Sequence, residues 1–386
     1  MKKRLSITIL GTLPPVRALS SYCFELACAL LENCNIEFLS FKSIYPAFLY
    51  PGGRPDGDDT YPNLDMPGLL VKRNLAWYNP FSWLYEGLLS KGELLHAQWW
   101  SMPLFPIYFT VCGCFKLRKK PVLFTVHNVL SHEKSAIYVA LSRLLFTLGD
   151  RFIVHSALNK QQLLELYKIP PDRVSVVPHG SLDFHVRPGI DRDSLRKERG
   201  LSSQSKVVLL FGAIRPYKGI DTAIRAFSKA AKQIPDARLL IAGRLWEDWA
   251  PYEKIIRDLQ IADRVITHLD YIPSGNVHAF FEVADLCVFP YHHFDSQSGA
   301  GAVALSFRKP MIVSDVGGLP ELVNDRQFVV PAADAEALAQ AMIRCLGDPA
   351  VLASMASDAE KVAGRFAWPG IAEKTKAIYE QLVSVG

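Results

Sequence analysis

The sequence predicts an α/β protein with two Rossmann-like domains, each built on a doubly wound parallel sheet, that face a central cleft. Short apolar segments typical of buried parallel strands alternate with helical segments along nearly the whole chain, and a parallel sheet requires this alternation. The chain has 386 residues, of which 49% are hydrophobic, and this suffices for two cores. We therefore expect one domain over residues 1–185 and a second over residues 205–366, joined by a helix-and-turn linker.

The first domain is expected to hold a series of strands. They are predicted at residues 6–11, from residue 37, and at residues 94–100, 122–128, 151–156 and 174–180, with helices from about residues 20, 103 and 158. The opening residues MKKRLSITILG carry only a short apolar run, so they are interpreted as the first strand and not as a signal peptide. Residues 94–115 are apolar enough to raise a membrane span as an alternative, but Gln98, Pro103 and Pro106 favour a strand followed by a helix.

The second domain is expected to repeat the alternation. Strands are predicted at residues 207–212, 238–243, 265–269, 286–289 and 311–313, with helices between them. One of these helices is expected to open at Pro320, because proline is favoured at the first helical position. Residues 333–347, 349–366 and 368–385 are expected to be helical.

Charge and cysteine content limit the partners and the compartment. Residues 1–200 contain 24 Lys and Arg against 17 Asp and Glu, whereas residues 201–386 contain 19 against 21. This modest basic excess suits an anionic acceptor or a lipid surface, with ordinary solvated surface as the alternative, and it does not form the stripe of a nucleic-acid-binding protein. Seven cysteines with mostly apolar neighbours are typical of reduced thiols. We expect a cytoplasmic protein, with peripheral contact at the inner face of the membrane as an extension, and no nucleic-acid partner.

The segment from Asp285 to Val323 has the features of an anion site. A polar loop follows the strand that ends at Phe289, and a helix is expected to start near Ser298. Free amides at a helix N-terminus and small residues beside them let a phosphate approach closely. An ordinary βαβα unit with polar loops is the alternative. The candidate donor-binding residues of this segment are Gln297, Ser298, Gly299, Ala300 and Glu321.

The same segment resembles the donor-binding signature of the family 4 retaining glycosyltransferases, which have the GT-B fold. The family pattern is Glu-x7-Glu, a Gly-Lys-Pro strand and a Gly-Gly-x-Pro-Glu turn. Residues 308–310 (Arg-Lys-Pro) and 317–321 (Gly-Gly-Leu-Pro-Glu) match its later parts, and counting back places Asp295 and Val303 at the two Glu positions. The resemblance implies that Asp295 contacts the donor sugar, whereas Val303 cannot bind the ribose as the second Glu does.

A second signature follows the strand at residues 207–212. An Arg gives a planar bidentate grip and a Lys a compact charge, and Arg215 and Lys218 together suit a diphosphate. Two solvated cations on a loop are the alternative. The loop resembles the diphosphate loop of the same family, although its commoner pattern has Arg where this chain has Ala213. The resemblance also implies donor contacts from Gly212, Gly243 and Arg244, and a base site near Tyr271.

Polar residues at strand ends of the first domain are candidates for the rest of the site. His127 resembles the strand-end His with which the family contacts the donor sugar, and a structural histidine is the alternative. The loop after the first strand lacks the Gly pair that family members often carry there. The acceptor-side candidates are Arg17, Ser20, Ser21 and Trp77, with Arg54 and Tyr78 beside them; a plain surface insertion is the alternative for residues 51–63.

The resemblance implies a retaining hexosyltransferase. It would move a hexosyl unit from a UDP- or GDP-sugar to an acceptor hydroxyl of a glycan, a glycolipid or a polysaccharide precursor. Its catalytic residues would be Arg215, Lys218, Asp295 and His127, and fixed cations and helix amides would stand in for a metal ion, so no metal or other cofactor is expected. The helix at residues 368–386 is expected to pack back on the first domain. A GT-B sugar-nucleotide epimerase and a non-catalytic GT-B partner subunit are the two alternatives.

Overall fold

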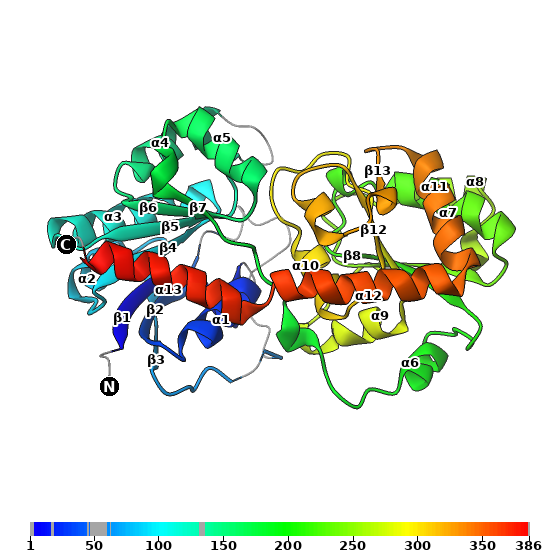
Figure 1. The fold of residues 1–386 in the computed structure, drawn as a ribbon, viewed down its shortest axis with the longest axis horizontal. Helices are drawn as coiled ribbons and strands as arrows, with labels where there is room; N and C mark the ends of the chain where they lie inside the picture. Colours follow the sequence, from blue (N-terminus) through cyan, green and yellow to red (C-terminus); the bar gives the residue numbers. More distant parts are fainter. Residues whose placement is uncertain are drawn as a thin grey trace. The chain divides into compact units, whose positions relative to one another are not determined.

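The computed structural model describes residues 4–16, 19–44, 46, 60–61, 63–130 and 136–384. The chain forms two compact units (Figure 1), of which unit 1 comprises Met1–Gly180 with Phe366–Gly386 and unit 2 comprises Ser181–Arg365. Each unit holds one sheet whose strand pairs are all parallel. The predicted fold class, two Rossmann-like α/β domains with parallel sheets, is therefore confirmed.

In the described part of unit 1, the sheet has seven strands in the order β3-β2-β1-β4-β5-β6-β7. The central strands at residues 94–99 and 122–126 are fully buried, as expected of strands that helices cover on both faces. The order reverses direction between β1 and β4, as in a doubly wound sheet. The strands are β1 (Leu5–Leu10), β2 (Cys34–Ser43), β3 (Leu69–Ala76), β4 (Leu94–Trp99), β5 (Val122–Val126), β6 (Arg151–Val154) and β7 (Val174–Val176).

The described residues of unit 1 form six helices. They are α1 (Ser20–Leu30), α2 (Pro80–Leu89), α3 (Phe105–Leu117), α4 (Ala136–Phe146), α5 (Ala157–Tyr167) and α13 (Trp368–Ser384), with 3₁₀ turns η2 (Met102–Leu104) and η3 (Pro171–Arg173). The C-terminal helix α13 packs against α1 and β4 (Figure 1). Its Tyr379 hydroxyl lies 2.6 Å from His96 Nδ1 of β4, so the end of the chain is tied to the centre of the first sheet.

Unit 2 contains a six-stranded sheet in the order β10-β9-β8-β11-β12-β13. The strands are β8 (Lys206–Phe211), β9 (Ala237–Ala242), β10 (Val265–His268), β11 (Leu286–Phe289), β12 (Met311–Ser314) and β13 (Val329–Val330). The helices are α6 (Arg192–Glu198), α7 (Ile220–Gln233), α8 (Ala250–Asp258), α9 (His278–Val283), α10 (Gly299–Ser306), α11 (Ala335–Gly347) and α12 (Pro349–Arg365). The 3₁₀ turns are η4 (Asp183–His185), η5 (Pro216–Lys218), η6 (Ala262–Arg264), η7 (Ser274–Asn276), η8 (Leu319–Leu322) and η9 (Arg326–Phe328).

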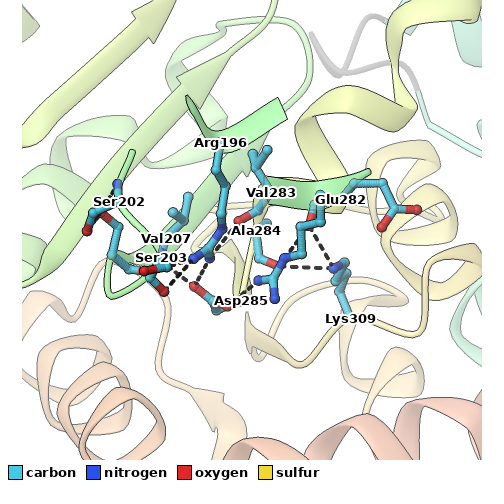
Figure 2. Close-up of polar contacts among 11 residues, drawn as sticks. Arg196, Ser202, Ser203, Val207, Glu282, Val283, Ala284, Asp285 and Lys309 are labelled. Carbon is cyan, nitrogen blue, oxygen red and sulfur yellow. Dashed lines mark hydrogen bonds and ion pairs between the residues drawn. The ribbon is translucent and has the colours of Figure 1, made fainter. Parts of the chain in front are cut away.

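Helix α6 of the linker region is fixed to unit 2 by charged contacts (Figure 2). The Arg196 guanidinium, which is buried, donates to Asp285 Oδ2 at 2.7 Å and to the Val283 carbonyl oxygen at 3.0 Å. Arg192 forms a second ion pair with Asp285. The Lys309 ammonium donates to the Ala284 carbonyl oxygen at 3.0 Å and to that of Glu282 at 3.5 Å, which satisfies carbonyls at the end of α9.

Several elements differ from the sequence prediction. The predicted helix at Pro320 is only the 3₁₀ turn η8, because the turn before it packs against a neighbouring loop and no apolar stripe follows. Strand β3 and helices α2 and α4 were not predicted. Within the described residues, no helix is long and apolar enough to cross a membrane. All seven cysteines are free thiols, and six of them are buried.

Candidate functional site

The candidate site of unit 2 lies where its strand order changes direction, between β8 and β11. In an open parallel sheet, the carboxyl ends of strands at such a point form the crevice in which ligands bind. The loops after β8, β9 and β11 and the start of α10 meet here. These segments carry most of the donor-side residues that the sequence predicts.

Two glycines bring these loops into close contact. A Cβ atom at Gly212 would lie 2.6 Å from Lys218 Nζ and 3.5 Å from Ala300 Cβ, and a Cβ at Gly243 would lie 2.1 Å from the Gly212 carbonyl oxygen. Both backbones have positive φ, +115° and +150°, which favours glycine. The Lys218 ammonium therefore lies directly over the end of β8, next to the first turn of α10.

Lys218 is a buried lysine whose ammonium has no acceptor among the described residues. It is 7% exposed; its backbone amide donates to the Arg215 carbonyl oxygen at 3.0 Å, but its Nζ forms no hydrogen bond or ion pair in the described part of the chain. Its Nζ lies 5.2 Å from the centre of the Tyr291 ring. Burial lowers the pKa of Lys218; Tyr217 opposes this shift and the Arg215 charge adds to it. An anion bound here would supply the negative charge that stabilises the buried ammonium.

Two further cations lie on the same loops. The Arg215 guanidinium stacks over the Trp246 ring, 3.8 Å from its centre, which holds it in place. The backbone amide of Ile214 donates to the Arg244 carbonyl oxygen at 2.8 Å, and the amide of Trp246 donates to the Ile214 carbonyl oxygen at 3.1 Å, so the two loops extend the ladder of the sheet. Neither arginine side chain forms an ion pair with a described residue. These loops thus carry three cations, Arg215, Lys218 and Arg244, that form no ion pair with a described residue.

The start of α10 adds unpaired backbone amides. Ser298 caps the helix, since its Oγ accepts from the Gly301 amide at 3.2 Å, and the same Oγ lies 3.0 Å from the Tyr291 hydroxyl. The amides of Gly299 and Ala300 have no carbonyl partner within the helix, and the space beside Gly299 is open. The helix dipole adds a partial positive charge at this end.

The turn after β12 packs against the loop after β11. The Gly318 amide donates to the Ser296 carbonyl oxygen at 3.1 Å, and a Cβ at Gly318 would lie 2.2 Å from Gln297 Nε2. Gln297 Nε2 donates to Glu321 Oε2 at 3.0 Å. Desolvation raises the pKa of Glu321, against the hydrogen bond from Gln297, which lowers it. Asp295 lies half-buried in the same loop.

Val303, at the second signature position, is buried in α10 and has no polar side-chain atom. It therefore offers the ribose no hydrogen bond.

In unit 1, His127 belongs to a buried cluster at the carboxyl ends of the strands. His127, His155 and His179 surround the Tyr22 ring, with ring centres 4.7, 5.4 and 4.9 Å from it. Burial lowers the pKa of His155 to about 3 and of His179 to about 4, and it lowers that of His127 well below its ordinary value. The cluster is therefore neutral at physiological pH.

The hydrogen bonds of this cluster fix its tautomers. His155 Nδ1 must donate to the Val177 carbonyl oxygen at 3.0 Å, because a carbonyl only accepts. His155 Nε2 then accepts from His127 Nδ1 at 3.1 Å, which leaves His127 Nε2 as an acceptor 3.0 Å from Gln98 Oε1. Two acceptors repel each other, and Gln98 Nε2 is buried without a partner. A half-turn of the Gln98 amide satisfies both atoms, so both ring nitrogens of His127 are engaged inside unit 1.

The acceptor-side candidates are spread over unit 1. Ser20 is fully buried and its hydroxyl donates to the Val16 carbonyl oxygen. Ser21 Oγ lies 2.8 Å from the Tyr61 hydroxyl, and Trp77 is exposed beside Tyr78. Arg17 and Arg54 lie outside the described residues. The structure brings none of the described candidates, Ser20, Ser21 and Trp77, into a shared contact.

Sequence reasoning missed several residues that complete both groups. Tyr291 and Trp246 hold the Lys218 and Arg215 side chains, and His155 and His179 complete the histidine cluster, next to Gln98, a polar residue that was expected at its strand end. His155 and His179 also stand at predicted strand ends. That position was the signal that could have found them.

Two protein families match the chain, one in each half. Residues 191–362 match the family described as Glycosyl transferases group 1, and residues 20–181 match Glycosyltransferase Family 4. The D-inositol 3-phosphate glycosyltransferase of Thermobispora bispora is 26% identical over 344 residues, which cover 82% of this chain and 76% of that protein. The protein of the same name from Corynebacterium aurimucosum is 29% identical over 249 residues, 61% of this chain. That match spans only 58% of the length of the relative.

Solved structures share the fold at low identity. Sucrose-phosphate synthase from Thermosynechococcus elongatus has a TM-score of 0.75 at 20% identity, over 99% of this chain and 100% of that chain. HepE of Anabaena, in a complex with UDP and glucose, has a TM-score of 0.74 at 17% identity, over 98% of this chain and 100% of its own.

Two parallel-sheet Rossmann-like units of this kind make up the GT-B fold, and the family matches identify a glycosyltransferase of the GT-B type. The chain belongs to the group 1, family 4 glycosyltransferases.

Proposed function

We propose that this glycosyltransferase moves a hexosyl unit from a UDP- or GDP-sugar to an acceptor hydroxyl of a glycan, a glycolipid or a polysaccharide precursor, with retention of anomeric configuration. The observation that carries the proposal is the buried Lys218 ammonium next to the first turn of α10, with Arg215 on the same loop and Arg244 on the adjoining one; none of the three forms an ion pair with a described residue. The negative charge of a diphosphate would balance these cations. The solved complexes of HepE with UDP and glucose and of starch synthase IV with ADP and acarbose support a nucleotide donor.

The proposed chemistry rests on the leaving group. The bond between the anomeric carbon and the diphosphate oxygen breaks, and a bond from the acceptor oxygen to the anomeric carbon forms on the same face. The departing phosphate oxygen takes the proton of the acceptor hydroxyl, while Lys218 remains protonated throughout. As negative charge grows on that oxygen, a fixed and desolvated ammonium and the amides at Gly299 and Ala300 stabilise it more than they stabilise the intact donor.

We also propose that no metal ion takes part. Fixed cations and helix amides occupy the role that a divalent ion would play at a diphosphate. Asp295 is proposed to orient the sugar through its carboxylate. His127 can contact a sugar hydroxyl through nitrogen only if that hydroxyl replaces Gln98 at Nε2, because both ring nitrogens are engaged.

Incubation with labelled UDP- and GDP-hexoses tests the proposal. We expect transfer or slow hydrolysis of one donor, a product of unchanged anomeric configuration by proton NMR, and activity that survives EDTA. Recovery of an epimerised sugar nucleotide would assign the chain to the epimerases instead. Binding of a nucleoside diphosphate without turnover of any donor would indicate a non-catalytic partner subunit. A thermal-shift screen of UDP, GDP and ADP selects the donor base first.

A further inference from the structure

Helix α2 of unit 1 exposes its apolar side chains and buries its charged one. Five of its ten residues are apolar or aromatic and stand in solvent, with exposed fractions between 44% and 81%: Phe81, Leu84, Tyr85, Leu88 and Leu89. Its only charged residue, Glu86, is 1% exposed. The exposed positions follow the i, i+3, i+4, i+7, i+8 spacing of one helix face. A helix that covers a core carries such a stripe on its inner side, whereas α2 carries it on the outer side.

The inner side of α2 is locked by polar and close contacts, so the helix cannot turn its apolar face inward. Glu86 accepts from Lys72 Nζ at 3.1 Å and from Asn74 Nδ2 at 2.6 Å, both on the neighbouring strand β3. Gly87 lies against α3, where a Cβ atom would come within 2.8 Å of Cys114 Cβ. Rotation would expose a paired carboxylate and force side chains into that contact.

The apolar face is bordered by basic residues. Residues 67–120 contain seven Lys and Arg against two Asp and Glu, and one of these two acids is the buried Glu86. Figure 1 shows α2 beside α3 in unit 1. Arg118, at the end of α3, donates to the carbonyl oxygens of Gly87 at 3.0 Å and Ser90 at 2.7 Å. Lys91 and Lys119 are exposed close by, as is Leu117 at the end of α3.

We infer that unit 1 docks on an anionic lipid surface through the outer face of α2. An exposed apolar stripe rimmed by cations is the pattern of helices that lie in the membrane interface. Ten residues make a helix of about 15 Å, half of what a span needs, so α2 would lie in the interface and not cross it. A second copy of the chain fits this face less well, because its own basic rim would repel the first. The inference concerns attachment and goes beyond glycosyl transfer, so either can fail alone.

Vesicle co-sedimentation of the full chain tests this inference. The probes are vesicles of phosphatidylcholine alone and vesicles of phosphatidylcholine with phosphatidylglycerol, at low and at high salt. The test variant is Leu84→Ser/Leu88→Ser, which removes apolar groups from the stripe without touching the core. The matched control is Ile137→Ser/Leu144→Ser, which makes the same kind of change on the exposed side of α4 in the same unit.

We expect the wild type and the α4 control to sediment with phosphatidylglycerol vesicles, more weakly at high salt. The α2 variant should lose about tenfold or more in vesicle affinity, since each buried methylene group contributes to lipid affinity. Size-exclusion chromatography and circular dichroism show whether each variant keeps its oligomeric state and its fold. Equal binding by the α2 variant and the wild type, or no binding to any vesicle, would overturn the inference. So would a wild-type dimer that the α2 variant converts to a monomer, because the face would then be an interface between copies.

Discussion

Replacement of Lys218 by methionine should separate stability from catalysis. Lys218 is 7% exposed, and its ammonium forms no hydrogen bond or ion pair with a described residue. Burial lowers its pKa, which means that the fold disfavours the charged form. Methionine has a similar length and no charge, so it removes the cost and keeps the volume. If the Lys218 charge serves to bind the diphosphate, its loss should lower turnover without lowering the free energy of unfolding.

The expected magnitudes follow from this position. Stabilising replacements typically add about 0.5 to 2 kcal/mol to the free energy of unfolding, and Lys218→Met should fall in that range. The loss of one preorganised donor costs about 3 to 4 kcal/mol in the transition state, or roughly 100- to 1,000-fold in turnover. Because the folded-state pKa of Lys218 lies below the unfolded value, the stability gain is fully present at any pH below the folded-state pKa. It should shrink as the pH rises past the folded pKa towards the ordinary lysine value.

Lys309 provides the matched control. It is a second lysine of unit 2, half-buried, whose pKa burial also lowers, but its ammonium donates to the carbonyl oxygens of Ala284 and Glu282. Lys309→Met should therefore destabilise the chain by about 1 to 3 kcal/mol, since it leaves buried acceptors unpaired. Turnover per folded molecule should stay close to the wild type.

Urea unfolding followed by circular dichroism gives the stability change, and donor turnover at saturating concentration gives the chemical step. Isothermal titration with the free nucleoside diphosphate separates affinity from turnover, and affinity should fall much less than turnover. If Lys218→Met destabilises the chain as much as Lys309→Met, Lys218 is a structural residue. If its turnover matches the wild type, Lys218 does not act on the leaving group.

Three further predictions concern the pH response, the linker and α10. In the unfolded chain His155 and His179 are protonated below about pH 6.5, whereas in the folded chain their pKa values are only about 3 and about 4. Stability should therefore fall as the pH drops below 6.5, by up to about 1.4 kcal/mol per pH unit for each histidine, and His155→Gln should reduce the slope in urea titrations by one such share. Asp285→Asn leaves the buried Arg196 without its carboxylate and should cost about 2 to 4 kcal/mol of unfolding free energy, with unchanged turnover of the folded fraction. Ser298→Ala should lower the unfolding free energy by about 1 kcal/mol and weaken nucleoside-diphosphate binding in calorimetry, because α10 loses its cap.

The regular part of the fold could be predicted because its strands are short, apolar and buried on both faces. Residues 122–126 (VLFTV) and 206–211 (KVVLLF) are of this kind. Strand β3 (LLVKRNLA) was not predicted, because it is an edge strand of its sheet and its polar residues are partly or fully exposed. Helix α2 was not predicted. The rule that a helix buries its apolar face does not hold for α2, whose apolar face is exposed.

The donor-side loops could be predicted because their chemistry is local. A strand end, a glycine and two cations lie within a few residues, from Gly212 to Lys218. The histidine cluster could not be assembled from the sequence, because His127, His155 and His179 come from the ends of three different strands, β5, β6 and β7. Nor could the engagement of the Ser20 hydroxyl by the Val16 carbonyl oxygen, which depends on the exact path of the loop.

The two features on which the proposals rest share one physical property. Most buried or displaced charges in this chain are compensated within it: Arg196 by Asp285, Glu86 by Lys72, and Lys309 by the carbonyls of α9. Lys218 and the outer face of α2 have no such compensation among the described residues. A natural sequence that keeps a locally unfavourable feature is expected to recover the cost in function. For Lys218 the compensation that we propose is a phosphate, and for α2 it is a lipid surface. Free nucleoside diphosphate should therefore raise the urea midpoint of the wild type through binding to the folded state, and Lys218→Met should lose most of this rise while the α2 variant keeps it.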